Sequence, residues 1–235
     1  MIALTPPGLT LQEWEAVRLS LSVAGRSVAF GLPVAILVSV LLSRRRFLGR
    51  PLLDAIVHLP LVLPPVVVGW GLLLLFGVRG PIGALLLDWF GIRLVFTSAG
   101  AALATAVMAF PLMVRSIRLS LEAVDPGLEA AARTLGAGPL DRFVTITLPL
   151  MTPGILSGAV IAFAAGLGEF GAVITFAANI EGQTQTLPLA IYAALQVPGG
   201  EATAARLSAI SFTLAVAGLL LSEVIARRMH RLLGQ

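Results

Sequence analysis

The acidic side chain of Glu169 lies deep inside an apolar stretch of the sequence, where a carboxylate is unusual. An ionisable group within a membrane-spanning segment costs free energy, so such a residue is a candidate for function. Gly168 precedes it, Phe170 and Gly171 follow it, and the two glycines leave the Phe170 ring room to move. We expect Glu169 to pair with an arginine or to shape a gate with these neighbours. The alternative is a structural ion pair or a hydrogen bond between helices.

Three prolines form the second set of candidate residues. Pro60, Pro64 and Pro65 lie within another apolar run. Proline lacks a backbone N–H, so each one frees a carbonyl group that neighbours, water or a transported molecule must satisfy. These prolines are therefore candidates for a translocation path, together with the segment from Gly168 to Gly171. A simple kink in the helix is the alternative.

Two missing residue types exclude whole classes of chemistry. The 235-residue chain has no cysteine, which excludes disulfides, thiolate catalysis, zinc–thiolate sites and iron–sulfur clusters. All sixteen basic residues are arginine, and a phosphate-binding P-loop requires a lysine. No nucleophile–base pair or group of metal ligands is visible. We predict no catalytic residue, metal site or cofactor in this chain, so another chain must supply energy for any active work.

The apolar residues that surround these candidates are gathered into long runs. Hydrophobic residues make up 57% of the chain and charged residues 12%, against about 25% charged in a typical soluble domain. A helix crosses a bilayer with about 20 apolar residues. Five runs qualify: Leu19–Ser43, Ile56–Gly77, Phe96–Ile117, Gly154–Ala177 and Leu207–Ala226. We predict an all-α integral membrane protein with about five transmembrane helices, or six with a short N-terminal or re-entrant helix.

The arginines indicate how these helices cross the membrane. Short loops on one side hold eleven of them: Arg44, Arg45, Arg46, Arg50, Arg115, Arg118, Arg133, Arg142, Arg227, Arg228 and Arg231. The other side holds Arg18, Arg79, Arg93 and Arg206, with Arg26 just inside the first run. Loops rich in arginine stay in the cytoplasm. The sequence therefore predicts an amino terminus outside and a carboxyl terminus in the cytoplasm.

The longest cytoplasmic segment, about residues 120–152, has the signals of two short helices. Asp125 followed by Pro126 suits a helix start, and Gly136 suits its end. The apolar residues between them fall at helical spacing on one face: Leu128, Ala131, Ala132 and Leu135. The Gly138–Pro139 pair starts a second short helix that carries Leu140, Phe143 and Val144. Two exposed amphipathic helices are elements that a groove on a partner protein can bind.

This segment resembles the EAA signature of ABC importer permeases: Glu-Ala-Ala, three residues, Gly, nine residues, Ile, any residue, Leu-Pro. Leu148–Pro149 match its end, and Ile146 and Gly136 stand at the required spacing. Ala130 takes the place of the signature's glutamate, which is displaced by one position to Glu129, so the contact of Glu129 stays open. The resemblance implies that the segment couples to ATPase subunits through Glu129, Ala130, Ala131, Ala132, Leu135, Gly136, Leu140, Ile146, Leu148 and Pro149.

Three further stretches narrow the resemblance to molybdate and tungstate permease subunits. They are Leu59–Gly69, Gly168–Ala172 and Asn179–Pro188. Sulfate and thiosulfate permeases share the Gly-Glu-Phe-Gly region, so a sulfate or thiosulfate permease is the alternative. An ATP-independent anion channel or secondary transporter would leave the EAA-like segment without a purpose. A membrane assembly factor would tolerate changes at Glu169 and Phe170.

The resemblance implies a type I ABC importer architecture in the cytoplasmic (inner) membrane. We expect one transmembrane permease domain over residues 1–235, with a coupling loop at about 120–152 and an extracytoplasmic loop at about 178–205. Implied partners are a second copy of this chain, two ABC ATPase subunits that bind ATP and Mg, an extracytoplasmic oxyanion-binding protein and membrane lipid, but no nucleic acid. Residues 183–201 form either a surface helix, which we favour, or a re-entrant segment.

Overall fold

A computed structural model describes residues 8–44 and 47–232, so Arg45 and Arg46 of the arginine-rich side lie outside the described residues. In this part of the chain the regular elements are all helical. They are α1 (Leu11–Arg44), α2 (Arg50–Val62), α3 (Pro65–Phe76), α4 (Pro81–Phe90), α5 (Ser98–Glu122), α6 (Pro126–Thr134), α7 (Pro139–Arg142), the π-helix η1 (Phe143–Thr147), α8 (Leu148–Leu167), α9 (Gly171–Ala177), α10 (Leu187–Leu195) and α11 (Glu201–Leu232). The predicted all-α class is confirmed.

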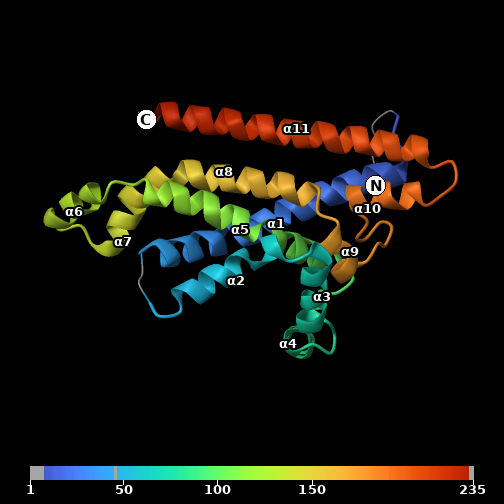
Figure 1. Cartoon of the computed structure of the whole chain (residues 1–235), viewed down its shortest axis with the longest axis horizontal. Helices are drawn as coiled ribbons and strands as arrows, with labels where there is room; N and C mark the ends of the chain where they lie inside the picture. The colour runs from blue at the N-terminus through green and yellow to red at the C-terminus, as the bar shows by residue number, and fades with distance from the viewer. Residues whose placement is uncertain (1–7, 45–46, 233–235) are drawn as a thin grey trace.

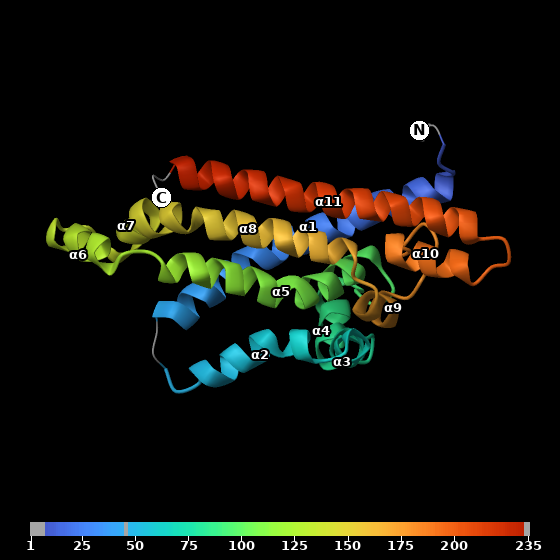
Figure 2. The ribbon, with the colours of Figure 1, turned by 45° about the horizontal axis from the view of Figure 1, so that its top comes forward.

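Long apolar helices form the body of the molecule. Figures 1 and 2 show α1, α5, α8 and α11 running lengthwise, with α1, α5 and α8 packed on one another and α11 on α8. Four helical segments are long and apolar enough to cross a membrane, and α3 with α4, bent by 47°, makes up to five. This agrees with the predicted number. The helices α6 and α7 lie at one end of the bundle and α10 at the other (Figure 1); we call these the α6 end and the α10 end.

The second predicted span, Ile56–Gly77, is not one helix. The chain leaves helical geometry at Leu63 and Pro64, where ψ is 144° and 135°, and so separates α2 from α3. Pro64 and Pro65 both lack the N–H that would continue the hydrogen-bond ladder, and a proline forces the residue before it into extended backbone. The prolines therefore break this span rather than bend it.

The fourth predicted span also differs from the expected Gly154–Ala177. It starts earlier, because α7, η1 and α8 form one uninterrupted helical segment of 29 residues, Pro139–Leu167. The second short helix thus begins at Pro139 as predicted but is not a separate element. The span ends earlier too, since the chain breaks after Leu167 and resumes as α9 at Gly171. The predicted gate residues lie in this break.

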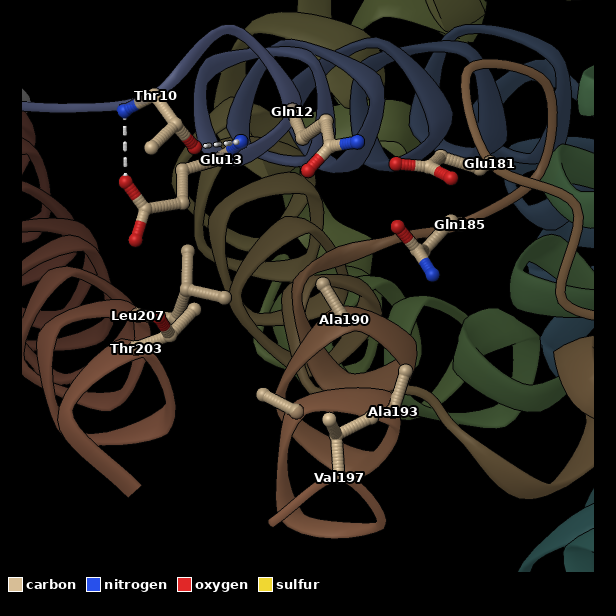
Figure 3. Close-up of a pocket in the computed structure, with 11 residues that line it drawn as sticks. Thr10, Gln12, Glu13, Glu181, Gln185, Ala190, Ala193, Val197, Thr203 and Leu207 are labelled. Atoms are coloured by element: carbon tan, nitrogen blue, oxygen red, sulfur yellow. Dashed lines mark hydrogen bonds between the residues drawn. The ribbon is translucent and has the colours of Figure 1, made fainter. Parts of the chain in front are cut away.

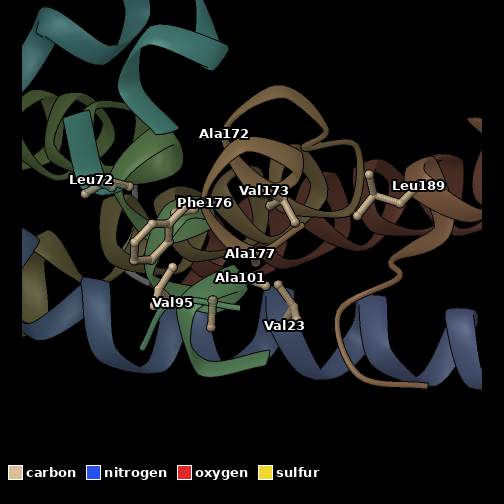
Figure 4. Packing of buried hydrophobic residues seen from close by; sticks show 11 residues of the cluster. Val23, Leu72, Val95, Ala101, Ala172, Val173, Phe176, Ala177 and Leu189 are labelled. Atoms are coloured by element: carbon tan, nitrogen blue, oxygen red, sulfur yellow. The ribbon is translucent and has the colours of Figure 1, made fainter. Parts of the chain in front are cut away.

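A core of small residues joins the break to the rest of the bundle. Figure 4 shows the Phe176 ring of α9 close to Leu72 of α3 and to Val95. Ala101 and Ala104 of α5 are completely buried, which lets the neighbouring helices approach closely. The segments that carry the predicted gate are therefore held by packing within this chain.

The α10 end contains the loop that the sequence predicts to be extracytoplasmic. The helix α10 packs on α11 and α1, with Leu187 and Leu189 fully buried. The buried Ser20 hydroxyl of α1 accepts a hydrogen bond of 2.6 Å from the Leu187 N–H. Residues 187–195 are thus a helix docked on the ends of two long helices.

Candidate functional site

The two predicted gate motifs meet where α3 crosses α9. A Cβ atom added at Gly69 of α3 would lie 2.7 Å from the Ala172 carbonyl oxygen, and one added at Gly171 of α9 would lie 2.7 Å from the Pro65 Cβ. Distances this short leave room only for glycine on each helix. Gly69 ends the Leu59–Gly69 stretch that resembles molybdate permeases. The sequence does not identify it as a contact residue, because the helix that it contacts is about 100 residues away in the chain.

Glu169 acts on the helix that follows it. Its carboxylate accepts a hydrogen bond of 2.8 Å from the N–H of Ala172, in the first turn of α9. A carboxylate at a helix N-terminus satisfies a free N–H and complements the helix dipole. Within residues 8–44 and 47–232, Glu169 makes this helix-capping bond and has no arginine partner, in contrast to the expected ion pair.

Phe170 connects the break to the α10 end. Its ring centroid lies 5.3 Å from that of Tyr192 on α10, with the two planes tilted by 56°. Phe170 is partly buried and packs against the core of small residues, whereas Tyr192 is exposed, so the pair joins the break to the surface of α10. Pro60 lies apart from this cluster. It lines an apolar hollow with Phe30 of α1 and Phe110 of α5.

The coupling segment has the predicted local structure. Asp125 caps α6 by accepting a 2.8 Å hydrogen bond from the Gly127 N–H, and Gly136 ends the helix region with a φ of +88°, which favours glycine. No residue of α6 or α7 is buried. Leu135 and Leu140 are 88% and 76% exposed. The chain therefore presents apolar side chains here that its own core does not cover.

Glu129 connects three elements of the α6 end. Each of its carboxylate oxygens accepts a hydrogen bond from a different guanidinium nitrogen of Arg44, the last residue of α1. One of these oxygens also accepts a hydrogen bond from the buried hydroxyl of Thr147, the last residue of η1. We call this group of three residues the Glu129 clasp. Neither Arg44 nor Thr147 stood out in the sequence as a partner of Glu129.

The surroundings of Glu129 favour the ionised form of its carboxyl group. The hydrogen-bonded Arg44 guanidinium lowers the pKa of Glu129 against the opposing effect of desolvation, and the Thr147 hydroxyl and the charge of Arg142 act in the same direction as Arg44. The group borders a hollow of about 420 Å³ whose other walls include Val40, Leu140 and Phe143. Remaining members of the predicted coupling set are partly or largely exposed: Ala130, Ala131, Ala132, Ile146, Leu148 and Pro149.

A second hollow, of about 390 Å³, lies at the α10 end (Figure 3). The Glu13 carboxylate on its wall is almost completely buried and accepts hydrogen bonds from the Thr10 N–H and from Arg206 of α11, the latter at 2.7 Å. Glu181 and Gln185 border the same hollow. The ion pair between Glu13 and Arg206 joins the first long helix, α1, to the last one, α11, and so holds the two helices together at the α10 end.

The chain is similar to known transport proteins. A family model described as "Binding-protein-dependent transport system inner membrane component" matches residues 31–231. The chain is 59% identical over 219 residues to the molybdenum transport system permease protein ModB of Escherichia coli (strain K12), covering 93% of this chain and 96% of that protein. It is 40% identical over 182 residues to the sulfate transport system permease protein CysT of Salmonella typhimurium, covering 76% and 65%.

A solved structure has the same fold. A chain of a bacterial alginate ABC transporter, in complex with an alginate pentasaccharide-bound periplasmic protein, superposes with a TM-score of 0.74 at 19% identity. The match covers 94% of this chain and 80% of that one. This likeness confirms the predicted fold.

Proposed function

The chain belongs to the family of binding-protein-dependent transport system inner membrane components, and from this premise we propose that it is the permease subunit of an ATP-driven molybdate importer. The observation that carries the substrate is the 59% identity to a molybdenum permease along nearly the whole of both chains. The sulfate permease relative is 40% identical over a shorter stretch. Tungstate, which has the same shape and charge as molybdate, belongs to the same proposal.

The proposed complex contains two copies of this chain, two cytoplasmic ATPase subunits and an extracytoplasmic oxyanion-binding protein. The exposed leucines of α6 and α7 support the ATPase contact, because apolar side chains that are uncovered on a monomer mark interaction sites. In the proposed complex, ATP and Mg would bind to the ATPase subunits, and this chain would contribute neither a nucleotide site nor a catalytic residue. The α6 end would then face the cytoplasm and the start of α1 the outside, within the cytoplasmic membrane.

Alternating access follows from how the segments are connected. ATP binding would close the ATPase subunits and move α6 and α7 with them. Since α7 continues into α8, that motion would reach the break at Gly168–Phe170, where α9 and α3 are in contact. The path would open beside this closely packed contact to accept an anion from the binding protein. Only weak contacts are needed along the path, because tight binding would slow release.

The test is element-resolved uptake in cells that lack this chain, with nanomolar molybdate, tungstate and sulfate supplied. We expect molybdenum and tungsten uptake to be lost and sulfur uptake to stay intact, and expression of the chain should restore the loss. Loss of sulfur uptake alone would assign the protein to the sulfate branch. Unchanged uptake of all three elements would contradict the proposed cargo.

A further inference from the structure

The one-residue displacement of the coupling-loop glutamate changes the direction in which its carboxylate points. One residue corresponds to about 100° around an α-helix. Position 130, where the signature has its glutamate, is exposed in this structure, whereas Glu129 is half-buried and faces the bundle. The displaced carboxylate is therefore turned from the open surface of α6 toward the chain's own helices.

The contacts of Glu129 are those of a built connection. Two parallel hydrogen bonds between a guanidinium group and a carboxylate fix orientation as well as distance. The ion pair joins residues 85 positions apart, and the Thr147 hydroxyl adds the junction between η1 and α8. The Glu129 side chain is 20% exposed and that of Arg44 is 36% exposed, so the pair lies at the protein surface with its carboxylate partly shielded from water.

The rest of α6 has little other attachment. It has no buried residue, and its packing within the chain is light and directed to α7 and η1. The clasp also lies where η1 passes into α8, and π-helical turns are common at functional sites. The polar contact at Glu129 is thus the main link from α6 to the first span.

We infer that Arg44 is a positioning residue for coupling: through Glu129 it fastens α6 to the end of α1 and to the start of α8, so that movement of α6 is passed to both spans. This inference rests on the proposed function. Arg44 acts by keeping the coupling helix in register with the spans.

The experiment compares variants of the assembled complex in proteoliposomes with binding protein and molybdate. Three variants open the clasp: Arg44→Ala, Glu129→Gln, and the double variant Glu129→Ala/Ala130→Glu, which returns the carboxylate to the exposed face. The ratio of ATP hydrolysed to molybdate taken up is the readout. We expect this ratio to rise at least about 3-fold while the ATPase still copurifies. The exchanged pair Arg44→Glu/Glu129→Arg should bring the ratio at least halfway back.

The matched control is Asp54→Asn, which breaks a 2.6 Å ion pair to Arg118 between α2 and α5 at the same end of the bundle. It should leave the ratio unchanged, which separates loss of this particular clasp from loss of any ion pair. A wild-type ratio in Arg44→Ala, or in the variant with the relocated carboxylate, would overturn the inference.

Amide hydrogen exchange tests the clasp without any transport. In the purified complex, the amides of residues 127–134 should exchange at least about 10-fold faster in Arg44→Ala than in the wild type, with α5 unaffected. Equal exchange in the two proteins would overturn the inference even if transport were impaired. A wild-type complex that moves no molybdate would contradict the proposed function instead, and the exchange result would still decide the role of Arg44.

Discussion

The α3–α9 contact and the α6 end are held together in opposite ways. At the first, two glycines bring helix backbones together over a dry core that includes Phe176 and Ala172, both fully buried. At the second, α6 and α7 bury no residue, and one carboxylate bridges three elements. Close packing tolerates little change of shape, whereas a polar clasp on an exposed helix can shift with a partner. We therefore expect the α3–α9 contact to move as one rigid unit, and α6 to move together with the partner protein that binds it.

The largest expected effect comes from adding volume at the glycine contact. Gly69→Val places a Cβ where the Ala172 carbonyl and the Thr175 side chain already lie, at 2.7 and 2.8 Å. Overpacking of this kind costs about 1–3 kcal/mol. Thermal unfolding in detergent should show a clear loss of stability. Gly71→Val on the same helix is the control, because its Cβ meets nothing within 4 Å. Equal melting of the two variants would refute the packing argument.

A smaller but specific effect is expected at the exposed coupling face. Leu135→Asp puts a charge on a side chain that is 88% exposed, so folding should be unchanged while ATPase binding weakens about 10-fold or more. Copurification of the ATPase is the measurement. Leu195→Asp, at an exposed leucine of the α10 end, should leave that copurification intact. If both variants lost ATPase copurification to the same extent, the ATPase contact would not be specific to the α6 end.

The aromatic pair at the break should have a moderate effect. Phe170→Ala removes the ring contact with Tyr192, and such pairs contribute about 0.5–1.5 kcal/mol. We expect ATP-independent leak of molybdate through proteoliposomes to rise about 3-fold. Tyr192→Phe keeps both rings and should not leak. Leak in Tyr192→Phe, or none in Phe170→Ala, would exclude this ring pair from gating.

The smallest expected effect is the pH dependence of the Glu129 clasp. Because Arg44 lowers the pKa of Glu129 in the folded protein, the clasp is stabilising above the ordinary glutamate pKa of about 4.3 and is lost as the pH falls through the lowered value. At pH 7, Glu129→Gln should therefore melt at a lower temperature than the wild type, and its free energy of unfolding should be lower by less than about 1 kcal/mol. The difference should vanish in acid. A difference that persists at low pH would argue against an ionic clasp.

Local signals in the sequence predicted the coupling segment well. The Asp125–Pro126 start and the Gly136 end depend on capping and backbone preferences that act within a few residues. The spans at 56–77 and 154–177 were less well predicted, although Pro64 and Gly168 were singled out. Whether a proline or a glycine bends a helix or ends it depends on what packs beside it, and hydrophobicity alone does not contain that information.

The contacts across the chain were beyond what the sequence predicts. The pairing of Gly69 with Ala172, and of Arg44 with Glu129, requires knowledge of which helices are neighbours. Arg44 was counted only as one of many arginines that orient the protein. The displacement of Glu129 was visible in the sequence, but its meaning depended on which face of α6 meets the bundle.

The uninterrupted segment from Pro139 to Leu167 has a mechanical consequence. Its 29 residues span about 43 Å at a helical rise of about 1.5 Å per residue, so a tilt of the segment as one body would move both of its ends. A tilt of about 10° around its midpoint displaces each end by roughly 4 Å, given the helical rise of about 1.5 Å per residue. The segment ends at Leu167, just before Gly168, so any movement beyond that point must be passed to the separate short helix α9. A displacement of the segment at its Pro139 end would therefore also displace its Leu167 end, next to the break.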